Sequence, residues 1–339
     1  MEGAAMNKFI GLDVHFQSTT IVVLDELGNE ELRQVIPTKE QVIRTLISSI
    51  PGCKSLTFEE SSMAQWLVAV LDGCVDKMIV CNPIYITKKT KAKTDYIDAL
   101  HLATELRAGN LTPVYHDHKN PLLDLRLLVS AYRSIVRHHV QTKNRFRTLF
   151  RSEGIEIPAG EKAFSSYEIT RRLKSPSRRE IASRLLEQYL ESESAKNKYL
   201  TNFKNITKEN PNIEKLRDIP GIDYVRAVTI AAIVGEAKRF LNKHHYWSYC
   251  GLVRHKQISG GTNYGYKKSR GRSELKEAYI GAAESCLINP NNPFRRLYDK
   301  HRSEGRDHRA AKKSVARKIA SVSLLILRTG KRFDEKLII

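Results

Sequence analysis

The sequence predicts an α/β domain followed by a mainly α-helical half, and three observations support this fold class. Residues 8–36 alternate apolar and polar side chains in the manner of β-strands. Helical segments and short apolar runs then alternate as far as residue 81. From residue 121 the periodicity becomes helical and the helices carry many arginines.

The N-terminal part is expected to form a mixed sheet with flanking helices. A first strand is followed by a hairpin, because residues 25–29 (Asp-Glu-Leu-Gly-Asn) form a turn between two apolar runs. The elements expected next are a helix over 39–49, a strand over 56–58, a helix over 64–71 and a strand over 77–81. Three strands followed by alternating helices and strands are typical of such a sheet.

Two long helices are expected in the middle of the chain. The first runs from about residue 121 to 150 and ends before the glycines and proline of residues 154–160. The second, from about 177 to 203, is expected to run back against it, as an arm or a dimer contact. Asn210-Pro211-Asn212 then marks a boundary. The predicted domains are residues 1–118, 119–208 and 209–339.

Composition favours a polyanionic partner. The 339 residues contain 57 Lys and Arg against 37 Asp and Glu, a formal net charge of +20, and neutralising phosphates releases condensed counterions. The five cysteines are odd in number and widely spaced, which indicates free buried thiols in a reducing cytosol. The sequence has no signal peptide and no apolar run of about 18 residues, so a cytoplasmic protein without membrane contact is expected.

Four carboxylates are candidate metal ligands: Asp13, Glu59, Asp95 and Asp98. Asp13 lies in an apolar strand, where a carboxylate needs a compensating charge. Glu59 ends another strand, and its rival Glu60 is expected to point the other way. Asp95 and Asp98 share one helix face at i, i+3 spacing. The alternative is an ordinary helix start, in which Thr94 caps the helix and Asp95 interacts favourably with the helix dipole.

Taken together, these acids predict phosphodiester chemistry on nucleic acid. Two metals about 4 Å apart need several shared carboxylates. A sheet of the RNase H type would supply them in the order found here: a strand acid, a strand-end acid and a helix pair. In a basic chain, cations held by such acids would meet phosphate oxygens bound by lysine and arginine.

Ser259 is a candidate nucleophile. The glycines that follow it let the backbone approach a phosphate, and a basic run comes next; the alternative is an ordinary turn in a basic loop. No histidine or lysine stands at a spacing diagnostic of serine activation, so the metal site is the expected activator. The predicted nucleic-acid contacts are Lys88, Lys89, Lys91, Lys93, Gly260, Gly261, Lys267, Lys268, Arg270 and Arg272.

Three further groups are expected to play supporting roles. Tyr264 and Tyr266 are expected to stack on bases or sugars, since a tyrosine nucleophile would leave the acid cluster without a purpose. The pairs His138-His139 and His244-His245 lack a matching cysteine or acid at metal spacing and are expected to be solvated or interfacial. The first long helix carries a basic stripe: Arg133, Arg137, Arg145, Arg147 and Arg151.

The motifs around the candidate residues carry a family resemblance. The N-terminal ones are Gly-Leu-Asp-Val-His at 11–15, Phe-Glu-Glu-Ser-Ser-Met-Ala-Gln-Trp-Leu at 58–67 and Lys-Thr-Asp-Tyr-Ile-Asp-Ala at 93–99. The C-terminal ones lie at 216–222, 249–253, 258–261 and 268–271. In this order they resemble the DEDD transposases of insertion sequence family 110, which include bridge-RNA-guided recombinases and Piv-type DNA invertases.

The resemblance implies an α/β RuvC-like (RNase H fold) domain, an α-helical coiled-coil arm and a mainly helical C-terminal transposase domain with a helix-hairpin-helix-like segment. It implies that Asp13, Glu59, Asp95 and Asp98 bind Mg²⁺. It further implies that Ser259 attacks DNA phosphate, forms a covalent phosphoserine and releases a 3′-hydroxyl. A homodimer assembling to a tetramer on donor and target DNA is implied, with acids and serine contributed by different protomers.

Three functions remain open at this point. The first is a recombinase guided by a structured bridge RNA encoded beside the gene, as the resemblance implies. The second is a Piv-like site-specific invertase that needs no RNA. The third is a non-catalytic nucleic-acid-binding protein descended from a transposase.

Overall fold

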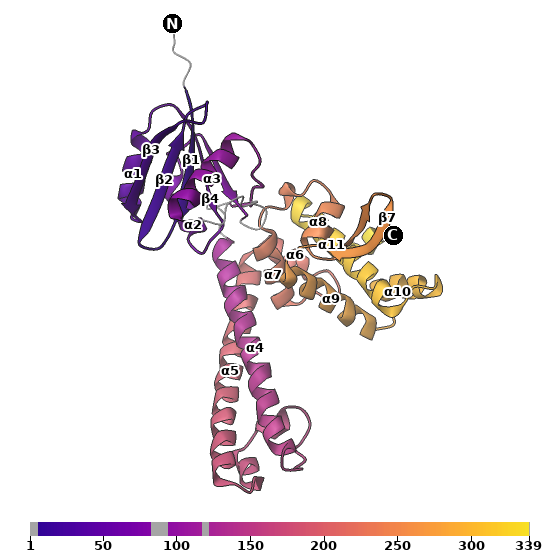
Figure 1. The fold of residues 1–339 in the computed structure, drawn as a ribbon. Coiled ribbons are helices and arrows are strands. Elements are labelled where there is room, and N and C mark those ends of the chain that lie inside the picture. The colour runs from indigo at the N-terminus through magenta and orange to yellow at the C-terminus, as the bar shows by residue number, and fades with distance from the viewer. Residues whose placement is uncertain (1–5, 83–93, 117–121, 339) are drawn as a thin grey trace. The chain divides into compact units, whose positions relative to one another are not determined.

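The computed structural model describes residues 6–82, 94–116 and 122–338. It divides into two compact units, residues 1–120 and residues 121–339, and each is described by itself (Figure 1). Unit 1 is an α/β domain and unit 2 is mainly helical. This confirms the predicted α/β and helical halves of the chain.

Within its described residues, unit 1 holds a five-stranded mixed sheet in the order β3-β2-β1-β4-β5. Antiparallel pairing joins β1 to β2 and β2 to β3, whereas β1, β4 and β5 pair in parallel. The strands are β1 (Asn7–Val14), β2 (Ser18–Leu24), β3 (Glu30–Pro37), β4 (Cys53–Glu59) and β5 (Lys77–Cys81). The mixed sheet was predicted from the strand alternation.

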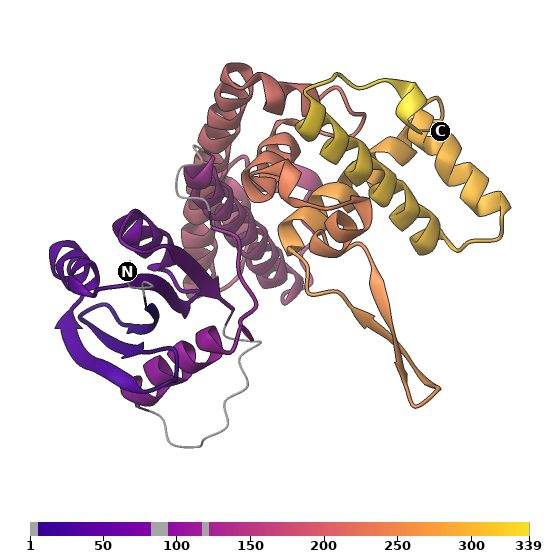
Figure 2. The same ribbon diagram turned by 90° about the horizontal axis from the view of Figure 1, so that it is seen from above.

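Helices cover both faces of this sheet. The helices α1 (Glu40–Ser49) and α2 (Ala64–Leu71) pack on one face against Ile10, Leu12 and their neighbours. The helix α3 (Asp95–Arg107) packs on the other face, and Figure 2 shows it across the sheet from α1 and α2. Alternation along β1 therefore assigns its even-numbered side chains to the α1–α2 face and its odd-numbered ones to the α3 face.

The contact between β1 and α3 depends on Gly11. A Cβ at this position would lie 2.1 Å from the carbonyl oxygen of Ala99 and 2.6 Å from the backbone nitrogen of Ala103. Both are backbone atoms of α3, so any larger residue would force the helix away from the strand. The two alanines are fully buried, and this small-residue contact holds α3 directly over β1.

Unit 2 begins with two long helices, α4 (Leu123–Arg151) and α5 (Pro176–Glu209), which run back against each other (Figure 1). Their far ends enclose a cluster that contains Phe146, Phe150 and Phe164. Short 3₁₀ helices over Gly160–Phe164 and Tyr167–Arg172 complete this end. The helical pair was predicted, although α5 is longer at its C-terminal end than the predicted 177–203.

One of the histidine predictions in this region was wrong. His139 is buried between α4 and α5, with its Nδ1 2.9 Å from the Ser192 hydroxyl and its ring 4.4 Å from the Tyr189 ring. Burial lowers the pKa of His139, which favours the neutral imidazole in this packed position. His138, His244 and His245 are exposed, as expected for solvated residues.

The remainder of unit 2 is a helical core with one projecting hairpin. Its elements are α6 (Pro211–Leu216), α7 (Tyr224–Val234), α8 (Lys243–Tyr249), β6 (Arg254–Ser259), β7 (Thr262–Lys268), α9 (Ser273–Ile288), α10 (Pro293–Ser303) and α11 (His308–Thr329), with 3₁₀ helices over Ala237–Arg239 and Glu335–Ile338. Val129 of α4 and Phe203 of α5 belong to the same core as α7, α9 and α11. The division at residue 208 between arm and C-terminal domain stays a prediction.

The five cysteines are free, as predicted, and four of them are buried. Burial is the main cause that raises the pKa of Cys81 and of Cys286 to about 11, so these thiols stay protonated at neutral pH. Among the described residues, no helix is both long enough and apolar enough to cross a membrane.

The Gly11 contact leads to a stability prediction. Gly11→Ala is expected to lower the free energy of unfolding by about 1–3 kcal/mol, because the added methyl group would overlap the backbone of α3. Urea denaturation followed by circular dichroism measures the change. Gly281→Ala in α9 is the matched control: its Cβ would meet the end of the Arg226 side chain at 3.0 Å and no backbone atom, so it is expected to change stability less than Gly11→Ala. Equal stability of Gly11→Ala and wild type would contradict this account of the contact.

Candidate functional site

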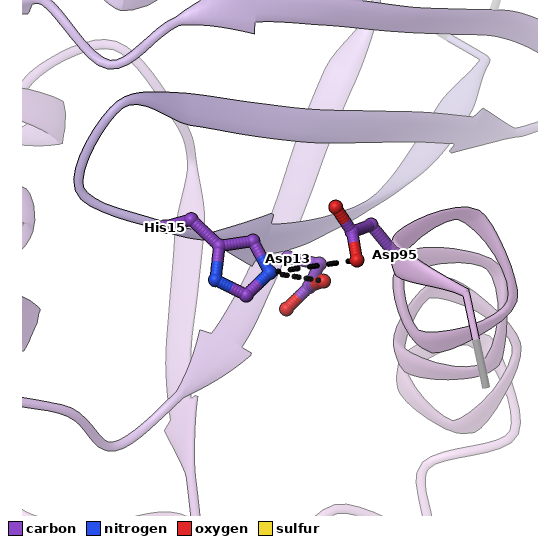
Figure 3. Close-up of side chains that lie close together, drawn as sticks. All are labelled: Asp13, His15 and Asp95. Atoms are coloured by element: carbon purple, nitrogen blue, oxygen red, sulfur yellow. Dashed lines mark ion pairs between the residues drawn. The ribbon is translucent and has the colours of Figure 1, made fainter.

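Three side chains from the end of β1 and the start of α3 gather at one point in unit 1 (Figure 3). The Nε2 of His15 lies 3.2 Å from Oδ2 of Asp13 and 3.6 Å from Oδ1 of Asp95. One ligand atom from each of the three residues lies within 4.8 Å of the other two. The structure therefore brings together two of the four predicted acids and one histidine.

Local sequence explains each of these positions. Asp13 follows Gly11 by two residues on β1 and so shares its α3 face. Thr94 caps α3 by accepting a hydrogen bond from the Ile97 amide at 3.3 Å, which confirms the predicted cap. The helix consequently starts with Asp95 and Asp98 in its first turn.

The electrostatics of the cluster favour a bound cation. Burial raises the pKa of Asp13; His15 opposes this shift, and the nearby Asp95 and Asp98 carboxylates add to it. Asp98 thus lies close enough to act on Asp13, although it is outside the group of three. Like charges held together at a half-buried position are stabilised when a cation binds between them.

Glu59 lies on the same face of the sheet as Asp13. Leu12 pairs with Phe58 in the parallel register of β1 and β4, and the residues that follow each of them turn to the α3 side. Glu59 pairs with Cys81 of β5, and its charge contributes to the raised pKa of that thiol. Among the described residues, Glu59 does not join the group formed by Asp13, His15 and Asp95.

Glu60 has a different environment. Its Oε2 lies 2.8 Å from Nε2 of His116, and its backbone amide donates to the carbonyl oxygen of Cys81. Strand alternation predicts that Glu60 points away from Glu59, and this stays a prediction; the pairing with His116 gives Glu60 a partner outside the cluster. This geometry favours Glu59 over Glu60 as the candidate ligand.

His15 is a residue of the site that the sequence reasoning did not single out. It follows Asp13 by two residues, and this spacing can place two side chains on the same side of an extended segment. A histidine two residues after an acid in a strand is the sequence pattern that indicates His15 as a possible ligand. The signal is weak by itself, because the strand ends at Val14 and the direction of the next side chains is not fixed by alternation.

The residues present fit a divalent cation. Carboxylate oxygens are ligands that suit Mg²⁺ and Mn²⁺, and an imidazole nitrogen suits transition metals such as Fe²⁺ and Zn²⁺. The Asp13 side chain is 21% exposed, whereas those of His15 and Asp95 are more than half exposed. The cluster is therefore open on one side, which leaves room for water or a substrate oxygen.

Ser259 lies at the end of β6, in the hairpin of unit 2 (Figure 2). It pairs with Thr262 across a two-residue turn made by Gly260 (φ 54°) and Gly261 (φ 80°). Two positive φ values in succession are the geometry of a tight hairpin turn, and glycine adopts them without strain. Ser259 is exposed, and no hydrogen bond engages its hydroxyl within the described part of the chain. A loop was expected here, and the structure has a hairpin.

The predicted nucleic-acid contacts divide into three sets. Lys88, Lys89, Lys91 and Lys93 lie outside the described residues, as does the side chain of Lys268. Lys267, Arg270 and Arg272 are exposed, and the two arginines take part in contacts within the protein. Gly260 and Gly261 form the exposed turn of the hairpin. Tyr264 near this turn and Tyr266 farther along β7 each expose about two thirds of their surface, so their rings can be reached by a base or sugar.

The predicted arginine stripe on α4 is only partly exposed. Arg133 forms an ion pair with Glu277 at 2.9 Å, and Arg147 donates to the carbonyl oxygen of Gly160 at 2.9 Å. Arg137, Arg145 and Arg151 are exposed. Two of the five arginines thus have structural roles within unit 2.

The acid cluster predicts a stabilising substitution. Because the folded state raises the pKa of Asp13, the ionised carboxylate costs stability once the pH has risen above the folded pKa. Asp13→Asn is therefore expected to raise the melting temperature at pH 7 in EDTA and to have little effect below the ordinary carboxylate pKa. Mg²⁺ or Mn²⁺ should stabilise the wild type and not the variant.

Differential scanning calorimetry with and without the cation makes this measurement. Glu60→Gln is the control, because it removes a neighbouring acid that is paired with His116 and lies outside the cluster. A lower melting temperature for Asp13→Asn in EDTA at pH 7 would contradict the electrostatic account.

Two protein-family models match this chain. A model described as a transposase, whose name carries DEDD and IS110, matches residues 10–153 and so includes all four candidate acids. A second, described as the transposase IS116/IS110/IS902 family, matches residues 213–299, which include Ser259. Together the two matches cover about two thirds of the chain, in the order expected of one protein.

Curated relatives agree with these matches. A 43.6 kDa uncharacterised protein of insertion element IS110 from Streptomyces coelicolor is 30% identical over 123 residues, which is 36% of this chain and 30% of that protein. The transposase for insertion sequence element IS1111A from Coxiella burnetii is 23% identical over 298 residues, 84% of this chain and 79% of that protein. The chain thus spans less than a third of the first relative and most of the second. With both family models matched in order along it, this chain belongs to the IS110 family of transposases.

Proposed function

We propose that this chain is the metal-dependent DNA recombinase of an insertion sequence, and that it cuts and rejoins DNA through a covalent phosphoserine at Ser259. The observation that carries the proposal is the convergence of Asp13, His15 and Asp95, with Asp98 close to them. Family membership supports the same function, because the matched models describe transposases.

The acids have a specific role in this proposal. Asp13, Asp95 and Asp98 would hold Mg²⁺, and Glu59 would complete the set from the same face of the sheet. When bound, the cation supplies charge stabilisation at phosphate oxygens and makes a hydroxyl easier to deprotonate. The strand order and mixed pairing in unit 1 are consistent with a RuvC-like fold, which we propose for this domain.

Ser259 would act as the nucleophile. Its Oγ forms a bond to phosphorus while the bond from phosphorus to the 3′ oxygen breaks, and the serine proton goes to solvent or a neighbouring base. The 3′ oxygen takes up a proton and leaves as a hydroxyl, and the 5′ side stays attached as a phosphoserine diester. Attack by another 3′-hydroxyl reverses these steps and joins new ends. The tight Gly260-Gly261 turn lets the phosphate approach Ser259 closely.

We further propose that the working assembly is a homodimer that pairs into a tetramer on donor and target DNA, with an element-encoded bridge RNA as the guide. The basic charge of the chain suits both polymers. The second candidate is a Piv-like invertase without RNA. The third, a non-catalytic binding protein, would retain every activity after substitution of Asp95 or Ser259.

Substitution of the nucleophile tests the chemistry. Ser259→Ala is expected to bind DNA as the wild type does, yet to lose the covalent protein–DNA adduct and at least about 10³-fold in recombination, because the attacking oxygen is gone. Denaturing gels detect the adduct, and a plasmid recombination assay gives the rate. Ser273→Ala, at the exposed start of α9, is the matched control and should behave as the wild type. Recombination by Ser259→Ala at the wild-type rate would refute the phosphoserine.

A second experiment tests the guide. When the gene is expressed with its native flanking DNA, a discrete RNA that maps to the flank is expected to stay bound to the purified protein through a high-salt wash. Sequencing of the retained RNA measures this, and expression of the coding region alone is the control. Only scattered cellular RNA, or none, would contradict the guided mechanism and favour the invertase.

A further inference from the structure

A basic pocket of about 600 Å³ lies in unit 2, away from Ser259 along the same hairpin. Its walls are the beginning of β6, Tyr266 of β7 and the first turns of α11. Four cations line it: Arg254, Arg309, Lys313 and Arg317. We refer to these four residues and the space between them as the α11 pocket.

Several cations of the α11 pocket lie close enough to act on one another. Arg309, Lys313 and Arg317 are spaced four residues apart, so they share one face of α11, where like charges repel. Burial lowers the pKa of Lys313, and Arg317 and Arg254 lower it further. The fold therefore places a strong positive potential inside a partly enclosed space.

The protein supplies little compensation. Asp307 is the acidic residue in the lining: its Oδ1 accepts a hydrogen bond from the Ala310 amide at 2.9 Å and caps α11, and its charge also acts on Arg309. Across the described ranges, none of the four cations of the α11 pocket forms an ion pair with a carboxylate. The Nε of Arg317 is buried and has no hydrogen-bond partner among the described residues.

This arrangement fits a phosphodiester. Arginine guanidinium groups bind phosphate oxygens through two parallel hydrogen bonds, and lysine adds a point charge. The exposed ring of Tyr266 offers a surface for the sugar or base attached to the phosphate. We propose that the α11 pocket binds a backbone phosphate of the nucleic-acid substrate, separate from the phosphate that Ser259 attacks. This inference rests on the proposed function for the identity of the substrate.

The geometry of β6 suggests which phosphate this is. Arg254 and Ser259 are the two ends of the strand, and five residues of β-strand span roughly 17 Å at about 3.3 Å per residue. Successive nucleotides of a duplex strand rise about 3.4 Å along its axis, so with the hairpin aligned along that axis the bound phosphate would lie roughly five nucleotides from the one attacked.

Salt-dependent binding tests the proposal. The full chain and the double variant Arg309→Ala/Lys313→Ala are titrated against a fluorescein-labelled DNA duplex and, in a second arm, a single-stranded RNA, over a series of NaCl concentrations. The variant is expected to bind severalfold more weakly, with a slope of log K against log salt that is less negative by about one or more, since each phosphate contact contributes roughly 0.9. Weaker binding of the variant to the DNA duplex identifies DNA as the ligand, and weaker binding to the single-stranded RNA identifies RNA.

Two controls make the result specific. Lys331→Ala/Lys336→Ala removes the same charge from exposed positions outside the α11 pocket and should change the slope less. Arg309→Lys/Lys313→Arg keeps the charges and should restore binding, which excludes misfolding as the cause. Equal slopes for the two alanine double variants in both arms would overturn the proposal. Nucleic-acid binding does not need Ser259, so the two proposals can fail separately. If Arg309→Ala/Lys313→Ala binds more weakly while Ser259→Ala still recombines DNA, the phosphoserine is refuted and the proposal for the α11 pocket is supported.

Discussion

The backbone contact between Gly11 and α3 is the constraint on which the candidate metal site depends. It allows the helix to lie directly on β1, where Ala99 and Ala103 meet Gly11 at the crossing. The same crossing brings the first turn of α3 to the end of β1, where Asp13 faces it. A bulkier residue at position 11 would therefore move Asp95 away from Asp13, although neither candidate metal ligand would itself be replaced. Gly11 and Asp13, two residues apart in the motif at 11–15, therefore both depend on how α3 crosses β1.

The two units carry opposite kinds of charged surface, one suited to binding a cation and the other to binding an anion. Unit 1 concentrates carboxylates at one point, which raises the pKa of Asp13 and favours a cation. Unit 2 presents cations: an exposed hairpin with Ser259 at its turn, and the α11 pocket at the base of that hairpin. A phosphodiester is a ligand that both kinds of surface can bind, the first through a cation and the second directly.

Much of the fold could be predicted because its elements follow strong local patterns. Alternation over residues 8–36 predicts strands that agree with β1 to β3 to within a few residues. The cap at Thr94 likewise predicts where α3 begins. Other features depend on residues far apart in sequence. His139 is buried because Ser192 and Tyr189 lie against it in α5, and a periodicity argument on α4 alone cannot identify these partners. The position of His15 between two acids likewise depends on how α3 packs.

Anomalous diffraction from crystals soaked in Mn²⁺ tests the central claim most directly, because it locates the cation without reference to activity. The account predicts an anomalous peak about 2.0–2.3 Å from carboxylate oxygens of Asp13 and Asp95, and loss of that peak in Asp13→Asn. Mn²⁺ bound elsewhere on the protein, with no peak between Asp13 and Asp95, would contradict it.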